Sequence, residues 1–141
     1  MGYDPNNIFA RILKGEIPAF RVYEDEHTLA FMDVMPQAEG HTLVVPKAPA
    51  ENLFDLDPAM AAAVMRSTQT VAAAVKQAFA ADGIMLMQFN GPAAGQTVFH
   101  FHLHIVPRYA DRPLRQHGRE AAPAAVLEEH ARRVREALQR R

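Results

Sequence analysis

The chain of 141 residues contains no cysteine or tryptophan, is 49% hydrophobic and 22% charged, and has a net charge of −1. Its length suits one domain with a sizeable core, its composition argues against disorder, and the missing cysteine excludes disulfides, thiolate zinc sites and a cysteine nucleophile. A near-neutral chain with no long apolar run and no signal-peptide pattern predicts a cytoplasmic protein that binds neither nucleic acid nor membrane.

The first half of the chain predicts one short helix and three strands. We expect the helix over residues 8–14, because Asn6 or Asn7 can cap its start and Gly15 can end it. The strands are expected where apolar or alternating segments are separated by turn residues, at 20–24, 28–34 and 41–46.

The second half predicts a long helix, two strands and a final helix. Asp57-Pro58 is a typical helix start, and the apolar stripe that follows extends to about Ala80. Further segments are expected as a strand at 84–89, a loop at 90–96, a long strand at 97–107 and a helix from Pro123 onward. This order predicts an α+β domain with an antiparallel five-stranded sheet and flanking helices.

The charges are distributed unevenly along the chain. Residues 1–111 hold 7 basic and 12 acidic side chains, whereas residues 112–141 hold 8 basic and 4 acidic ones. The basic segment favours a solvated helix face, and a role in steering phosphate or in contacting a second subunit stays open. We therefore predict a domain over 1–110 and a C-terminal extension with a basic helix over 111–141.

Three of the seven histidines lie within five residues, at His100, His102 and His104. They alternate with apolar residues, so on a strand all three would point to one face while their neighbours enter the core. Neighbouring histidines would be about 6.8 Å apart and the outer two about 13 Å, because a strand rises about 3.4 Å per residue. That spacing is too long for one zinc ion to bind all three.

The histidine row is compatible with three roles. Two of the histidines could share a metal with ligands from elsewhere, or all three could be buried structural residues with satisfied hydrogen bonds. Alternatively, one imidazole is a nucleophile while its neighbours fix its tautomer and bind the attacked group. The loop at 90–97 favours catalysis, because it can present backbone N–H groups, an amide and a hydroxyl to an anion, although an ordinary hairpin loop looks the same.

The run from His100 to Val106 resembles the histidine triad (HIT) family motif, His-x-His-x-His followed by apolar residues. The resemblance extends from Asn7 to about Arg108, and its further blocks lie at 8–19, 29–34, 40–47 and 95–99. It implies a homodimer whose two five-stranded sheets join, and a nucleotide hydrolase or transferase that acts at an α-phosphate.

The resemblance also implies roles for single residues. His102 would be the nucleophile that forms a nucleotidyl-histidine, His100 and His104 would orient it and bind phosphate oxygens, and His41 would complete the histidine network. Asn90 is expected to contact the nucleotide, although the family's polar phosphate contact aligns with Phe89. The other implied nucleotide-binding residues are Ile8, Phe9, Ile12, Phe31 and Val34 around the base, Asp33 at the ribose, and Gly95, Gln96 and Thr97 at the phosphate.

We therefore expect a hydrolase that acts on a purine nucleoside phosphoramidate or a dinucleoside polyphosphate, without a cofactor or metal. The chain resembles a general bacterial member between the Hint-type and Fhit-type branches of the family. The transferase branch carries glutamine at the third histidine, so His104 favours hydrolysis. A nucleotide-binding regulatory or scaffold module with little turnover and a metal hydrolase that uses only histidine remain alternatives.

Overall fold

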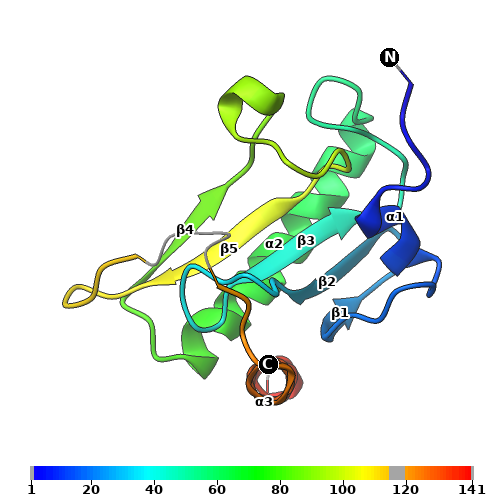
Figure 1. Ribbon diagram of the computed structural model, residues 1–141. Helices are drawn as coiled ribbons and strands as arrows, with labels where there is room; N and C mark the ends of the chain where they lie inside the picture. The colour runs from blue at the N-terminus through cyan, green and yellow to red at the C-terminus, as the bar shows by residue number, and fades with distance from the viewer. Residues whose placement is uncertain (1, 115–119, 141) are drawn as a thin grey trace.

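The computed structural model describes residues 2–114 and 120–140, and Figure 1 shows their arrangement. The predicted order of helices and strands is confirmed, with one short 3-10 helix added. The elements in chain order are α1 (Ile8–Leu13), β1 (Arg21–Glu24), β2 (Thr28–Met32), β3 (Thr42–Pro46), α2 (Pro58–Ala78), β4 (Gly83–Met87), η1 (Pro92–Ala94), β5 (Leu103–Arg108) and α3 (Ala124–Gln139).

The five strands form one antiparallel sheet in the order β1-β2-β3-β5-β4, which confirms the predicted fold class. The last strand in sequence therefore lies between β3 and β4, near the middle of the sheet. In this register Leu43 of β3 is opposite both Phe31 of β2 and His104 of β5. The histidine-bearing strand is thus placed beside the strand that follows His41.

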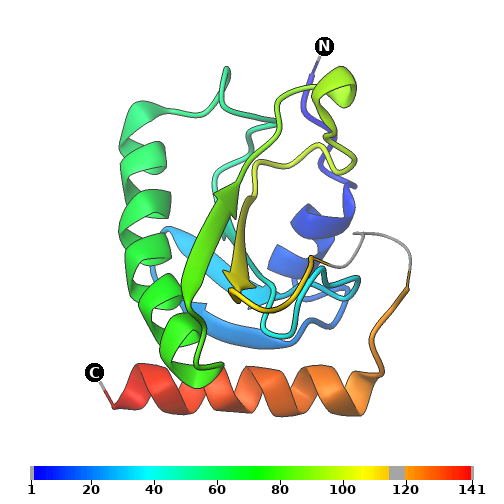
Figure 2. The same cartoon turned by 90° about the vertical axis from the view of Figure 1, so that its left-hand side faces the viewer.

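Helices cover both faces of the sheet, as Figure 2 shows with α2 on one side and α1 on the other. Alternation along the strands divides the buried side chains between these faces. Ala30 and Val44 join the core beneath α2 and α3, whereas Phe31 and Leu43 join a smaller cluster with α1. Among the helices of residues 2–114 and 120–140, none combines the length and apolar character needed to cross a membrane.

The basic C-terminal helix α3 packs on its own chain, across the end of α2 and against β1 (Figure 2). Its Val134 is fully buried in the main core. Arg133 donates to the carbonyl of Ala78 and Arg135 to that of Arg21. These two arginines therefore bind α3 to α2 and β1 through hydrogen bonds. The predicted division at residue 110 stays a prediction, and residues 115–119 of the predicted C-terminal extension lie outside the described residues.

The predicted strand over 97–107 is wrong in its first half, because regular pairing begins only at Leu103. The partner strand β3 is paired with β5 only from Thr42 to Val44. Before Leu103 the chain bends away, and the Phe101 amide instead donates to the carbonyl of Ala50 at 2.8 Å. Consequently His100 and His102 lie ahead of the strand, and the three histidines do not form the straight row that alternation predicts.

Candidate active site

A cavity of about 630 Å³ opens on the α1 face of the sheet, between α1, β2 and the segment that enters β5. Its walls are largely apolar. Among the described residues that line it, Asp33 is the only one with a carboxylate, and there is no lysine or arginine. The lining residues are Ile8, Phe9, Ile12, Ile17, Pro18, Ala19, Phe31, Asp33, Val34, Met35, Leu43, Phe89, Gly95, Thr97, Val98, His102 and His104.

Local structure explains how α1 supplies one wall of this cavity. The side chain of Asn7 accepts a hydrogen bond from the Ala10 amide at 2.9 Å and so caps the helix start. The turn that follows places Phe9 and Ile12 inward. The Phe9 ring meets the Phe31 ring edge-on at 5.4 Å and the His102 ring at 4.9 Å between centroids. The Phe9 ring therefore contacts both the apolar wall, through Phe31, and the candidate nucleophile His102.

The tautomer of His102 follows from one hydrogen bond. Its Nδ1 lies 2.7 Å from the backbone carbonyl oxygen of His100. A carbonyl only accepts, so the proton of the neutral ring is on Nδ1 and Nε2 carries the lone pair. The ring lines the cavity and is only 8% exposed. This is the tautomer that nucleophilic attack by Nε2 requires.

His104 has the opposite tautomer, because His41 determines it. The Gln37 amide donates to Nδ1 of His41 at 3.0 Å, so the proton of the fully buried His41 is on Nε2. That Nε2 lies 2.9 Å from Nδ1 of His104, which must accept, and 3.4 Å from an Asp33 oxygen. The proton of His104 is therefore on its Nε2, where it can donate to a bound oxygen.

The same three residues bring potential metal ligands together, since atoms of Asp33, His41 and His104 lie within 4.8 Å of one another. A metal ion needs an imidazole nitrogen with a lone pair. Nδ1 of His41 already accepts the Gln37 amide, so Nε2 holds the only ring proton. Binding a cation there would force His41 to become an anion or break this bond. The hydrogen-bond pattern therefore does not fit a metal ion bound by all three residues together.

His100 lies behind the cavity instead of lining it. Its fully buried ring is 2.8 Å from the Pro46 carbonyl through Nε2 and 2.6 Å from the Tyr3 hydroxyl through Nδ1. Burial, reinforced by the neighbouring His102, lowers the pKa of His100 despite the opposing bond to Pro46. His100 is therefore a neutral ring that supports His102 through its backbone, and its ring does not face the cavity.

Ten of the residues expected from the sequence line the cavity: Ile8, Phe9, Ile12, Phe31, Asp33, Val34, Gly95, Thr97, His102 and His104. Two others, Asn90 and Gln96, brace the nearby loops. Asn90 accepts from the Leu53 amide at 2.8 Å. Gln96 is buried, accepts from the Gly91 amide and donates to the carbonyl of Glu51. The amide of Gln96 therefore positions the loop before the histidines.

Sequence reasoning missed several wall residues: Ile17, Pro18, Ala19, Met35, Leu43 and Val98. Alternation could have found Leu43, because it is paired with Phe31 and so shares its face. The segment 17–19 carries no such signal, since only the path of the chain after α1 brings it to the cavity. Phe89 also lines the cavity, and its ring meets the His104 ring at 5.6 Å. An aromatic ring thus stands where the family resemblance leads one to expect a polar contact.

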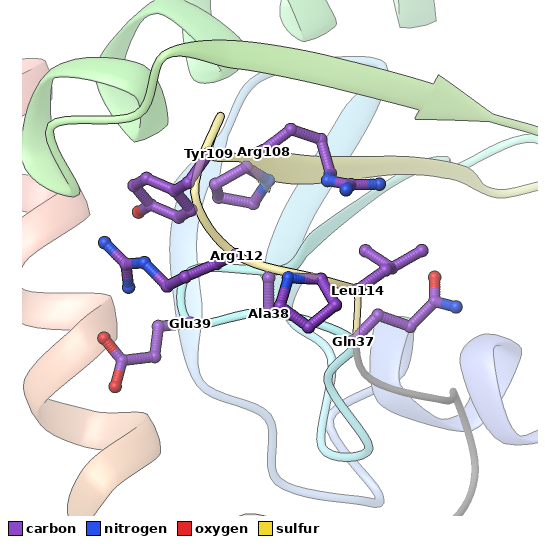
Figure 3. A pocket seen from close by; sticks show the side chains of 9 residues that line it. Gln37, Ala38, Glu39, Arg108, Tyr109, Arg112 and Leu114 are labelled. Atoms are coloured by element: carbon purple, nitrogen blue, oxygen red, sulfur yellow. The ribbon is translucent and has the colours of Figure 1, made fainter.

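A second hollow, of about 250 Å³, lies between the loop that contains residues 37–39 and the segment at the end of β5 (Figure 3). Arg108, Tyr109 and Arg112 border it on one side and Glu39 on the other. The Arg112 guanidinium is stacked on the Tyr109 ring at 3.8 Å and pairs with Asp111. The Arg112 guanidinium therefore already has partners within the chain, and we assign no ligand to this hollow.

Comparison with known proteins gives a consistent result. The HIT domain family model matches residues 14–111. Protein hit of Bacillus subtilis is 43% identical over 104 residues, which cover 74% of this chain and 72% of that protein. The adenylylsulfatase HINT3 of Arabidopsis thaliana is 35% identical over 117 residues, 79% of this chain and 59% of that protein. The crystal structure of a Hit-like protein of Bartonella henselae superposes with a TM-score of 0.91 at 50% identity, covering 96% of this chain and 99% of that one.

Proposed function

The chain belongs to the HIT domain family of nucleotide-binding, hydrolase-type proteins, and from this we propose that it hydrolyses a purine nucleotide derivative at the α-phosphate through a covalent intermediate on His102. The observation that carries the proposal is the pair of opposite tautomers. His102 has its lone pair on Nε2, and His104 has its proton on Nε2. One ring can attack phosphorus while the adjacent ring, 5.0 Å away between centroids, donates to a phosphoryl oxygen.

The reaction proceeds in two displacements. Nε2 of His102 forms a bond to the α-phosphorus, and the bond from phosphorus to the leaving group breaks, with the leaving group keeping the electron pair and taking up a proton. Water then attacks the same phosphorus, the bond from phosphorus to Nε2 breaks, and its electron pair returns to the ring. The water loses its proton, and the nucleoside monophosphate leaves. The Nδ1 bond to the His100 carbonyl stabilises the charged ring of the intermediate.

The apolar wall is the proposed site for the base. Ile8, Phe9 and Ile12 of α1 form this wall together with Phe31 of β2, whose ring the Phe9 ring contacts edge-on, and Val34, which is half exposed, also lines the cavity. A flat purine ring buried there would gain from apolar and aromatic contact. Asp33 follows β2 closely, so its carboxylate can accept hydrogen bonds from the ribose hydroxyls. One of its oxygens already accepts the Met35 amide at 2.8 Å, which fixes its orientation.

The charges of the cavity favour an amine over a polyphosphate as leaving group. A dinucleoside polyphosphate would bring several negative charges beside Asp33, and the described lining offers no lysine or arginine to balance them. An amine leaving group adds no negative charge. We therefore place nucleoside phosphoramidates first and dinucleoside polyphosphates second. Adenylyl sulfate, which the name of the Arabidopsis relative suggests, also has a leaving group on the α-phosphate.

The family resemblance implies a homodimer whose two sheets join, and we also propose that they join through β4. In the described chain β4 is an edge strand, paired with β5 only. One side of its backbone therefore has hydrogen-bonding groups that a second antiparallel copy could pair. Leu86 on this edge is 44% exposed, and burying it would add an apolar contact.

The alternative is a nucleotide-binding module with little turnover, and a substrate panel separates the two. The wild type is tested with adenosine 5′-phosphoramidate, diadenosine tetraphosphate and adenylyl sulfate, beside His102→Ala as the matched variant. We expect release of adenosine monophosphate, fastest from the phosphoramidate, and a loss of about four orders of magnitude in His102→Ala. Tight binding of the monophosphate without turnover of any of the three would support the binding module and contradict the hydrolase.

A further inference from the structure

The hydroxyl of Tyr3 lies 2.6 Å from Nδ1 of His100, and the two rings meet edge-on with centroids 5.6 Å apart. Tyr3 is five residues before α1 and does not line the cavity. His100 Nε2 is already committed as a donor to the Pro46 carbonyl. Nδ1 of the neutral ring must therefore accept, and the Tyr3 hydroxyl must donate. Burial raises the pKa of Tyr3, so this phenol keeps its proton at neutral pH.

The residue that Tyr3 contacts is also the one that orients His102. The backbone carbonyl of His100 accepts from His102 Nδ1 at 2.7 Å. The segment 97–102 is not a regular strand, so sheet hydrogen bonds do not hold this carbonyl in place. Instead the side chain of His100 is fixed at both ring nitrogens, by Pro46 and by Tyr3. The position of the His100 backbone, and with it the direction of His102, depends on these two bonds.

Tyr3 also connects this support to the wall of the cavity. The residues before α1 fold onto the helix, because Lys14 donates to the carbonyl of Pro5 and Asn7 to that of Asp4. The same helix presents Phe9 to the His102 ring. The N-terminal segment and α1 therefore touch the histidines at two points, through the Tyr3 hydroxyl and through the Phe9 ring.

We propose that Tyr3 is a positioning residue for the reaction at His102: its hydroxyl holds His100 in the tautomer and place that direct Nε2 of His102 at the phosphorus. The inference rests on the proposed hydrolase function. Because Tyr3 is outside the cavity, it acts on the chemical step and not on nucleotide binding. A residue that merely anchors the N-terminal segment would affect stability alone.

The test is Tyr3→Phe, which removes one oxygen atom and keeps the ring. The matched control is Tyr23→Phe, whose hydroxyl donates to Asp25 at 3.1 Å and is also outside the described lining of the cavity. With adenosine 5′-phosphoramidate we expect Tyr3→Phe to lower kcat about tenfold and to leave KM unchanged, because a buried acceptor loses its donor. The control should leave both constants unchanged. An unchanged kcat in Tyr3→Phe, or an equal loss in Tyr23→Phe, would overturn the proposal.

A second measurement does not depend on turnover. Nitrogen-15 NMR of the histidine rings reports the tautomer and the hydrogen bonding of each nitrogen. In Tyr3→Phe the His100 Nδ1 signal should move toward that of a nitrogen with no donor, and the Nδ1 proton of His102 should exchange faster with water. Tyr23→Phe should change neither signal. If the wild type hydrolyses none of the three substrates, the hydrolase proposal fails, whereas unchanged His100 and His102 signals in Tyr3→Phe would overturn the positioning role itself.

Discussion

Nε2 of His41 lies 2.9 Å from Nδ1 of His104, while the Gln37 amide occupies the other nitrogen of His41. A backbone amide thus determines, through two successive rings, which nitrogen of His104 carries a proton. This relay starts in the loop before β3 and ends at the wall of the cavity.

Replacing His41 with alanine should weaken both catalysis and folding. His104 loses the donor that fixes its tautomer, so kcat on adenosine 5′-phosphoramidate should fall about tenfold. The vacated buried site should cost about 2 kcal/mol of unfolding free energy. His130→Ala is the control, because His130 of α3 is also buried but packs edge-on against Phe79 instead of contacting His104. His130→Ala should lower the free energy of unfolding and leave kcat unchanged. An equal loss of kcat in His41→Ala and His130→Ala would refute the relay.

Gly40 is required just before His41. It has a φ of +90°, and an added Cβ would lie 2.6 Å from a ring carbon of Phe79. Gly40→Ala should therefore lower both the melting temperature and kcat, since the strained loop carries His41 and Gln37. Gly15→Ala is a matched control with a φ of +80° and open space around its Cβ. It should cost only about 1 kcal/mol. Equal losses of stability would mean that the Phe79 contact is unimportant.

Acid should destabilise the fold in two steps. Burial lowers the pKa of His100, so below pH 6.5 the unfolded chain binds a proton that the folded chain excludes, and stability falls as pH decreases. Desolvation by burial raises the pKa of Asp25, but hydrogen bonds from His27, Thr28 and Ser67 outweigh it and lower that pKa to about 2. Its contribution is present above the ordinary value of 3.8 and is lost as pH falls toward 2.

Urea denaturation at a series of pH values measures both steps. Asp25→Asn should be less stable at neutral pH and should lack the part of the decline between pH 4 and pH 2. A wild-type unfolding free energy that stays constant from pH 7 to pH 5 would contradict the first step. An unchanged slope in Asp25→Asn below pH 4 would contradict the second.

The proposed dimer predicts a different response at two exposed leucines. Leu86→Lys places a charge on the free edge of β4 and should convert the dimer to a monomer. Leu53→Lys is the control, since Leu53 is 50% exposed in the loop before α2. Light scattering coupled to size-exclusion chromatography measures the mass of each variant. A wild type that is monomeric, or a Leu86→Lys variant that remains dimeric, would rule out this interface.

The sequence predicted the fold well where periodicity carries the information. The strands expected at 28–34 and 41–46 correspond to β2 and β3, and Asn7 and Asp57 cap the helices that they were expected to cap. The error at 97–102 has a tertiary cause. The alternating residues Phe99 to His102 fit a strand, but the carbonyls of Ala50 and Pro46 take their hydrogen bonds. Phe99, which was expected in the core, is only half-buried.

Most of the residues expected at the site line the cavity, but the sequence did not predict their geometry. The order of the histidines in the chain could not reveal that His100 faces Tyr3, because that contact joins residues 97 positions apart. Likewise the tautomer of His104 depends on the Gln37 amide, and a backbone group has no sequence signal. The family resemblance implied that Asn90 contacts the nucleotide and that Gln96 lies at the phosphate, whereas the Asn90 side chain accepts from the Leu53 amide and that of Gln96 donates to the Glu51 carbonyl.

The most direct test of the account is the covalent intermediate. The protein is mixed with adenosine 5′-phosphoramidate, quenched within the first turnover in alkaline denaturant, and examined by intact-mass and peptide mass spectrometry. The account predicts a transient adenylyl adduct on His102 that is missing in His102→Ala. Turnover at the wild-type rate in His102→Ala, or an adduct carried by another residue, would contradict it.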